Sequence, residues 1–198
     1  MNNLLKRLPK LTAQPFKAGV LEGGHRHLQD NGLTSSELGI ICQNSILSHV
    51  TITSKDRLID YCNKKEAGFY IVNLDDSTDP RGGTHWVALH MKNKKFFSYF
   101  DSYGAPPPVE IMRLCHSSLI YSTKQIQADN STACGWFCLC FIIYFPLHDR
   151  DYQKFLNMFS TDLKLNDGIL FTLLDSFGIN HNLLQRSRRH PTNALFCF

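Results

Sequence analysis

The stretch STACGWFCLCFIIYFPL, residues 131–147, places three cysteines at the start of a long apolar run. Its apolar part, 135–147, is shorter than the about 20 residues that a membrane-spanning helix needs, so it predicts a helix inside a protein core. Cys134, Cys138 and Phe141 recur at the spacing of one helical face. We therefore expect this segment to form a buried core helix.

The three cysteines do not follow the pattern of a metal site. Structural zinc sites use a C-x2-C spacing with a second Cys/His pair, and neither is present around Cys134. Disulfides within one short helix are disfavoured, because the side chains seldom reach the required geometry. Free cysteine is often simply buried, and this interpretation suits Cys138 and Cys140.

Cys134 has a different setting, because it lies between the polar turn ADNSTA and the apolar helix. It is thus expected at or near the helix N-terminus, where free N–H groups and the macrodipole stabilise a thiolate. Its neighbours Ala133 and Gly135 are small and would leave room for the backbone of a substrate. This position favours a nucleophile.

Composition sets the broad class. A chain of 198 residues with 43% hydrophobic residues predicts one domain, with or without extensions, and a real core. A net charge of +4 permits contact with nucleic acid without requiring it. The start, MNNLLKRLPKL, lacks the apolar stretch of a signal peptide, so most of the seven cysteines are expected to be reduced, in a cytosolic or nuclear setting.

The order of elements predicts an α+β fold with a central mixed sheet flanked by helices. We expect an N-terminal extension over 1–33, one domain over 34–180 and a basic tail over 181–198. Within the domain the residue patterns predict a helix over 34–47, strands over 68–74, 84–91, 95–102 and 122–127, a helix after the prolines at 106–108, the cysteine-bearing helix, and two helices in DYQKFLNMF and DGILFTLLDSF.

A nucleophilic thiolate needs a base, and His85 opens a predicted strand after a glycine pair in RGGTHWVAL. Asp101 ends the next strand, and a tight turn at 92–95 would make the two residues neighbours across a hairpin. The carboxylate would then hold the imidazole tautomer and stabilise its cation. Considered alone, Asp101 is typical of a turn residue in DSYG. His85, considered alone, is typical of a histidine at an interface whose hydrogen bonds are satisfied. Together with Cys134 they favour a catalytic set.

The segments GGTHWVAL, YFDSYG and QADNSTACGWFC resemble the adenovirus-type cysteine endopeptidases. The same fold and the same order of His, acid and Cys occur in the wider group of proteases that release ubiquitin-like modifiers. The resemblance covers about residues 68–145. It is specific because of the glycine pair before His-Trp and the Gln seven residues before the Cys.

The resemblance implies a role for each matching residue. Cys134 would be the nucleophile and His85 the general base and later the acid. Asp101, where adenoviral enzymes tend to carry Glu, would orient the imidazole. Gln127 would donate its amide to the oxyanion together with the Cys134 N–H, unless it is only a polar residue at a strand edge. Trp86 would cover the site or pack in the core.

The function implied is a cysteine endopeptidase that cuts viral capsid or precursor proteins at Gly-Gly sites during virion maturation, without a metal or organic cofactor. The segment LEGGH, with Gly23 and Gly24, predicts self-cleavage before His25, or else a flexible turn. One alternative is a protease acting on ubiquitin-like modifiers, which Asp101 favours. Another is a non-catalytic binding module of the same fold, which four matching site positions disfavour.

The C-terminus carries RSRRH and ends in NALFCF. Because adenoviral proteases are stimulated by a basic peptide ending in Cys-Phe, the resemblance implies a built-in activating tail and a bridge between Cys115 and Cys197; the alternative is a frayed end. Stimulation by DNA through weak nucleic-acid binding is a further expectation, against a solvated charged face. We expect a monomer with no membrane contact, in the virion and in the host cytoplasm or nucleus, and not secreted.

Overall fold

The computed structural model describes residues 32–64, 67–79, 84–115, 118–180 and 184. In chain order, its elements are α2 (Ser35–Gln43), β1 (Thr51–Ser54), α3 (Leu58–Lys64), β2 (Gly68–Asn73), β3 (Trp86–Asn93), β4 (Phe96–Phe100), α4 (Val109–Leu114), β5 (Leu119–Tyr121), α5 (Cys134–Leu147), α6 (Tyr152–Leu156), the 3-10 helix η1 (Leu163–Leu165) and α7 (Asn166–Asp175).

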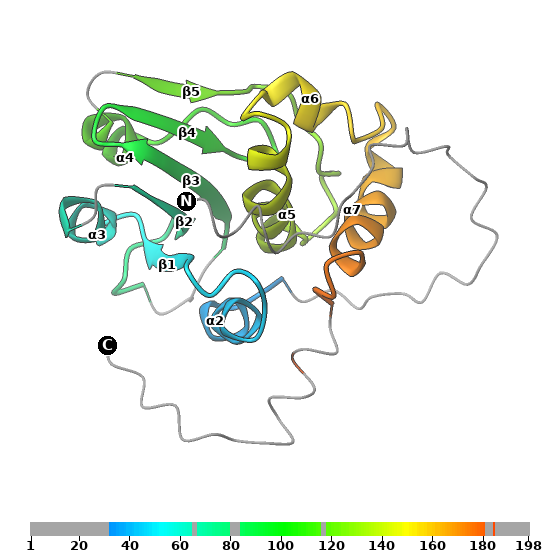
Figure 1. The fold of residues 1–198 in the computed structure, drawn as a ribbon, viewed down its shortest axis with the longest axis horizontal. Helices are drawn as coiled ribbons and strands as arrows, with labels where there is room; N and C mark the ends of the chain where they lie inside the picture. Colours follow the sequence, from blue (N-terminus) through cyan, green and yellow to red (C-terminus); the bar gives the residue numbers. More distant parts are fainter. Residues whose placement is uncertain (1–31, 65–66, 80–83, 116–117, 181–183, 185–198) are drawn as a thin grey trace.

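One five-stranded sheet forms the centre, in the order β1-β2-β3-β4-β5 (Figure 1). β3 is antiparallel to its neighbours β2 and β4, whereas β1 pairs with β2 and β5 pairs with β4 in parallel. The predicted α+β class with a mixed sheet is therefore confirmed. β1 and α3 were not among the predicted elements.

Both faces of the sheet are covered. On β3, Val87, Leu89 and Met91 join a cluster with α3 and α4, whereas Trp86 and Ala88 join the larger cluster around α5. This alternation follows from the two-residue period of a strand, and it explains why β3 is apolar on both faces. In Figure 1, α5 lies between the sheet and α7.

The cysteine-bearing segment forms α5 as predicted. All residues from Cys134 to Phe145 are buried, so the helix is covered on every side. Each large apolar side chain buried in this way contributes roughly 1.5–3 kcal/mol to the free energy of unfolding. In the part of the chain that the structure describes, no helix combines the length and the hydropathy that crossing a membrane requires.

The start of α2 is stabilised by a capping box. The Thr34 hydroxyl accepts the backbone N–H of Glu37, and the Glu37 carboxylate accepts the Thr34 N–H at 3.0 Å. The sequence indicated this N-terminus correctly, but the helix ends at Gln43 rather than continuing to residue 47. Asn44 occupies the C-cap there and donates its side-chain amide to the Ile40 carbonyl at 2.8 Å.

The prediction of a strand over residues 122–127 is wrong. The edge strand β5 ends at Tyr121, and the chain then passes the end of β4. There the backbone N–H groups of Ile126 and Gln127 donate to one acceptor, the Ser102 carbonyl, at 2.9 and 3.0 Å. A ladder strand would spread such donors over successive partners. These two hydrogen bonds to one carbonyl, rather than pairing within a strand, position Gln127.

Some predictions fall outside the described residues. Gly23, Gly24 and Cys197 lie there, so self-cleavage and the tail bridge stay predictions. The division into an extension, a domain and a basic tail likewise stays a prediction.

Candidate active site

His85 and Asp101 meet where two neighbouring strands begin and end. His85 directly precedes β3, and Asp101 directly follows β4. Nε2 of His85 lies 3.0 Å from Oδ2 of Asp101. The Asp101 side chain is fully buried, whereas 19% of the His85 side chain is exposed. The imidazole therefore has its acid partner inside the protein and one part facing outwards.

The sheet register makes this contact diagonal. Ala88 pairs with Phe100, so the same register continued by three residues sets His85 opposite Tyr103. The predicted contact between His85 and Asp101 is present, but they are not direct cross-strand partners. The irregularity between Met91 and Asn93 shifts the register by one residue, which moves the position opposite His85 from 104 to 103 but not as far as Asp101.

The turn DSYG holds Asp101 in place. Its Oδ1 accepts the backbone N–H of Tyr103 at 2.7 Å, and its Oδ2 accepts the Tyr99 hydroxyl at 3.4 Å. Gly104 ends the turn with a φ of +72°, and a Cβ there would lie 2.5 Å from the Thr123 carbonyl oxygen. Only glycine fits both demands, so this turn fixes the direction of the carboxylate.

Cys134 is the first residue of α5, and its side chain is close enough to His85 to raise the pKa of the imidazole. Because Nε2 faces Asp101, Nδ1 is the ring nitrogen left for the sulfur. Burial alone would lower the pKa of His85, but the hydrogen bonds and negative charges of Asp101 and Cys134 outweigh it and raise that pKa to about 9. An imidazole with a raised pKa is well suited to accept the proton of a thiol.

The start of α5 can stabilise negative charge. Ala133 is the N-cap, and no side chain in the described part of the protein caps the helix. The first amide N–H groups of a helix lack acceptors within it, and the macrodipole adds a partial positive charge. An oxyanion beside Cys134 would therefore be favoured at this end.

Gly135 is small for a reason other than the predicted one. A Cβ there would lie 3.2 Å from Cβ of Leu33 and 3.5 Å from Cδ1 of Trp86. Trp86 is buried, and its Nε1 donates to the Leu33 carbonyl at 2.6 Å. The missing side chain thus makes room for the protein's own chain before α2, and Trp86 packs in the core.

Gln127 lies in the site, but it is fully buried and all its polar atoms are engaged. Its Oε1 accepts the Ser102 hydroxyl at 2.6 Å. Its Nε2 donates to the Tyr103 hydroxyl at 3.1 Å and to the Ser131 carbonyl at 2.7 Å. Both amide hydrogens thus have acceptors within the protein in the absence of substrate, and the role of Gln127 as an oxyanion donor stays a prediction.

Tyr103 belongs to the site and was missed by the sequence analysis. Its ring centroid lies 5.3 Å from that of His85, and its hydroxyl donates to the Ser131 carbonyl at 2.9 Å. Burial first, and then the negative charges of Cys134 and Asp129, raise the pKa of Tyr103. The hairpin turn expected at 92–95 did not indicate it, because the observed register is what sets residue 103 opposite His85.

A second missed residue, Asp75, holds the chain just before His85. Its carboxylate accepts the backbone N–H of Thr84 at 2.9 Å and the Thr84 hydroxyl at 2.9 and 3.1 Å. Next to it, the Leu74 N–H donates to the His85 carbonyl at 3.0 Å. These contacts tie the segment that carries the imidazole to the end of β2.

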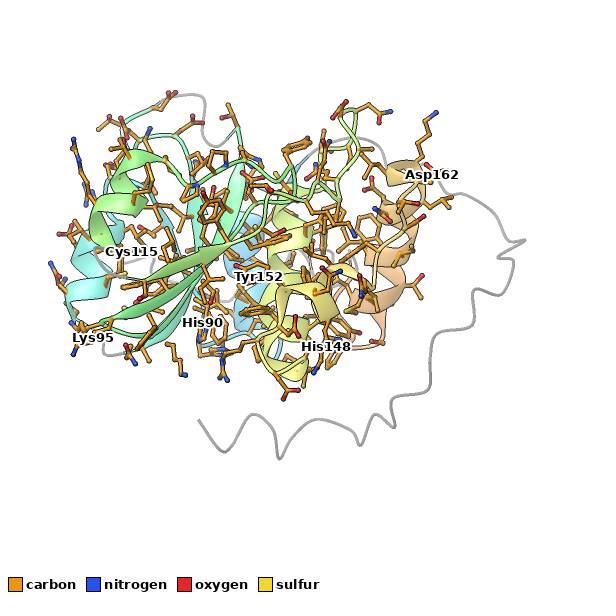
Figure 2. All side chains as sticks on the ribbon, turned by 90° about the horizontal axis from the view of Figure 1, so that it is seen from above. His90, Lys95, Cys115, His148, Tyr152 and Asp162 are labelled. Atoms are coloured by element: carbon orange, nitrogen blue, oxygen red, sulfur yellow. The ribbon has the colours of Figure 1, made fainter. Side chains whose placement is uncertain are left out.

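The remaining cysteines lie elsewhere or are buried. Cys138 and Cys140 are buried within α5, and burial is the largest cause of the raised pKa of the Cys138 thiol. Cys115 is a buried free thiol at the end of α4, away from α5 (Figure 2), and burial raises its pKa to about 12. Among the described residues, no group of three or more His, Cys, Asp or Glu side chains could hold a metal ion.

His85 and Asp101 lie in contact, with Cys134 at the start of α5. The chain is also similar to a curated viral protease. The chain is 30% identical over 129 residues to the protease of Bovine adenovirus 2, which covers 56% of this chain and 62% of that protease. The chain thus matches somewhat less than two thirds of that relative's length. This similarity confirms the resemblance to adenovirus-type proteases. No protein-family model matches the chain.

Among solved structures, a crystal structure of an ASFV protease gives a TM-score of 0.44 at 19% identity. The alignment covers 71% of this chain and 67% of that one.

Proposed function

We propose that this protein is a cysteine endopeptidase that cuts capsid or precursor proteins at Gly-Gly sites during virion maturation. The observation that carries the proposal is the arrangement of Asp101, His85 and Cys134 at the start of α5. The similarity to an adenovirus protease supports the choice of a viral maturation enzyme. Such a role places the protein in the virion and in the host cytoplasm or nucleus, acting as a monomer.

In the first half of the reaction, His85 takes the proton of Cys134, and the sulfur attacks the carbonyl carbon of the scissile bond. The carbonyl electron pair moves to oxygen, where the Cys134 N–H and the end of α5 stabilise the new charge. As the C–N bond breaks, the leaving amine takes a proton from the imidazolium. Asp101 stabilises that cation and keeps the ring oriented.

In the second half, water attacks the acyl thioester with His85 as the base. The C–S bond breaks, the product carboxylate leaves, and the Cys134 thiol is restored. The 19% exposure of the His85 side chain supports this role, because the base has to be reached by water.

Self-cleavage between Gly24 and His25 is part of the proposal. A Cβ on Gly32 would lie 3.1 Å from the Thr132 carbonyl, two residues before Cys134. Eight residue steps separate Gly24 from Gly32, and an extended chain of that length spans up to roughly 27 Å. The Gly-Gly pair is therefore tethered within reach of Cys134 on the same chain.

The test is to incubate candidate capsid precursors with the active protein and with Cys134→Ala, and to sequence the new termini. Cuts after Gly-Gly that need Cys134 support the proposal. Cleavage confined to ubiquitin-like modifier fusions would favour the alternative protease. If iodoacetamide labels Cys134 no faster in the native protein than in His85→Gln, a non-catalytic module is favoured. An uncut N-terminus in the active protein would remove self-cleavage alone.

An activating tail and stimulation by DNA also remain proposals. The buried Cys115, with its raised pKa, argues that a bridge to Cys197 would need local opening around α4. Truncation after Gln185 should lower activity if the tail activates, and unchanged activity would remove that idea. Salt-dependent retention on DNA would test the nucleic-acid contact.

A further inference from the structure

Asn166, the first residue of α7, fixes the start of that helix against the chain beside the active site. It is fully buried. Its Nδ2 donates to the Ile126 carbonyl at 2.8 Å and to the Ser160 carbonyl at 3.1 Å, and its Oδ1 accepts the Ser160 N–H at 2.8 Å. Ile126 directly precedes Gln127. The first turn of α7 is therefore held next to the loop that carries Gln127 and leads into α5.

Ser131 connects Gln127 to the start of α5, and each of its polar groups takes part. Its N–H donates to the Ala128 carbonyl at 2.9 Å, and its carbonyl accepts an N–H from Nε2 of Gln127 at 2.7 Å. Its hydroxyl oxygen accepts the N–H of Ala133, the N-cap of α5, at 3.2 Å. The orientation of Ser131 thus bears on both the Gln127 amide and the helix end that carries Cys134.

Asp167, the second residue of α7, sets the direction of the Ser131 hydroxyl. Its Oδ1 accepts the O–H at 3.1 Å, across 36 positions of the chain. A hydroxyl has one hydrogen, so directing it to the carboxylate leaves the lone pairs of the oxygen for the Ala133 N–H. Burial raises the pKa of Asp167, whereas the Ser131 hydroxyl lowers it by donating to the carboxylate. The hydrogen bond thus favours the charged form that accepts it.

We infer that Asp167 is a positioning residue for the oxyanion site, acting through Ser131 on the Gln127 amide and on the N-terminus of α5; this rests on the proposed function. Donors that stabilise an oxyanion are effective when they are already aimed at the oxygen as charge develops. Asp167 keeps Ser131 turned so that its carbonyl holds one amide hydrogen of Gln127 and its hydroxyl holds the N–H of the N-cap. No bond to Asp167 forms or breaks during the reaction.

The experiment compares two reactions of Cys134 in the full-length protein. Hydrolysis of a peptide p-nitroanilide ending in Gly-Gly builds an oxyanion, whereas alkylation by iodoacetamide displaces iodide at a saturated carbon and builds none. We expect Asp167→Ala to lower kcat by about 10–10²-fold, as a misplacement of up to 1 Å does, with KM nearly unchanged. The alkylation rate should stay as in the unmodified protein. The matched control is Asp175→Ala, at an exposed residue in the last turn of the same helix, which should change neither reaction.

A double-variant cycle tests whether Asp167 acts through Ser131. Ser131→Ala removes the hydroxyl but keeps the backbone N–H and carbonyl, so it should lower kcat at least as much as Asp167→Ala. Once the hydroxyl is absent, the carboxylate has nothing left to orient. Asp167→Ala should therefore cause no further loss in the Ser131→Ala background. Losses that multiply in the double variant would mean that Asp167 does not act through Ser131.

The outcomes separate this inference from the proposed function. If Asp167→Ala leaves kcat unchanged, or slows hydrolysis and alkylation equally, Asp167 has no positioning role and the protease proposal still stands. Thermal unfolding of each variant identifies a loss of fold. If Asp167→Ala does not fold, Ser131→Ala carries the test, and an unchanged kcat there overturns the inference as well. If the unmodified protein cuts the Gly-Gly peptide no faster than Cys134→Ala does, the proposed function itself fails.

Discussion

Two histidines of the β3 region have opposite electrostatic settings. His85, just before the strand, contacts Asp101 at 3.0 Å and has its pKa raised to about 9. His90, inside the strand, is buried and stacks on Phe69 with ring centroids 4.4 Å apart, with Phe145 of α5 at 6.4 Å. Its Nδ1 has no hydrogen-bond partner among the described residues. Figure 2 shows His90 between the sheet and α5.

The difference teaches that position decides what a histidine can do. Burial, and then the positive charges of Arg150 and Lys92, lower the pKa of His90 to about 4, because no anion offsets the loss of water. At His85 the same loss of water is outweighed by a carboxylate and a thiol. One ring is thus prepared to exchange protons, and the other serves as a neutral packing element.

The largest expected effect comes from removing each of the two histidines in turn. His85→Gln should lower kcat on a Gly-Gly peptide on the order of 10⁴–10⁶-fold, because the base is lost. His90→Leu, at the buried position, should leave kcat close to that of the unmodified protein. Steady-state kinetics on both variants measures the contrast. Equal losses at the two positions would show that His85 has no special role.

Asp101→Asn should break the feature that distinguishes the two rings. The amide keeps the size of the side chain but removes the negative charge, so kcat should fall by up to about 10⁴-fold. The pKa of His85 should fall from about 9, and the alkaline limb of the alkylation profile should move to lower pH. Alkylation rates over a pH series measure this. A profile that does not move would mean that Asp101 does not raise the pKa of His85.

The buried histidine should appear in stability against pH. His90 has a pKa of about 4 when folded and 6.5 when unfolded. Below pH 6.5 the unfolded chain therefore binds the proton first, and the free energy of unfolding drops until the folded form also protonates near pH 4. The total is roughly 3 kcal/mol. Urea unfolding of the unmodified protein and of His90→Leu at several pH values isolates this contribution, which should be absent from the variant.

His85 should act in the opposite sense in another window. Its stabilising contribution is complete below pH 6.5 and is lost as pH rises through about 9. The drop in the free energy of unfolding at acid pH should therefore still be present in His85→Gln in the same urea series. If the acid-side loss were identical in the unmodified protein and His90→Leu, the buried ring would not be its source.

The smallest expected effect concerns the contact that places His85. In the Asp75→Asn variant, the side chain can accept fewer hydrogen bonds from Thr84 than the carboxylate does. We therefore expect kcat to fall roughly tenfold, which is less than the loss of about 10²-fold that a 1 Å misplacement costs. The matched control is Asp76→Asn, because the exposed Asp76 carboxylate forms a surface ion pair, with its Oδ1 3.7 Å from Nζ of Lys55. If both variants lose activity equally, loop charge rather than positioning is responsible.

Local patterns predicted the parts of the site that one segment can define. The polar turn followed by an apolar run located Cys134 at the start of α5, and the hairpin pattern brought His85 near Asp101. The helix start at Thr34 was readable because a capping box is a local motif. β1 was missed because a four-residue strand with partly buried side chains leaves little periodic signal.

Contacts between distant segments were not predictable in the same way. Whether Gln127 faces a substrate or a tyrosine depends on Ser102 and Ser131, which lie on different loops. Gly135 suggested open space in the sequence, but the chain at Leu33 fills it. Each case depends on which neighbour arrives from far along the chain, and sequence spacing carries no such information.

The sequence by itself determined a buried helix with a cysteine at its N-terminus and a histidine and an aspartate at adjoining strand ends, because helix and strand periods act within a few residues. Only the tertiary structure decided that the Gln127 amide bonds to the Tyr103 hydroxyl, and that the pKa values of His85 and His90 shift in opposite directions. The physical reason is that desolvation and hydrogen-bond partners are properties of the packed site, and packing joins residues that the chain keeps apart.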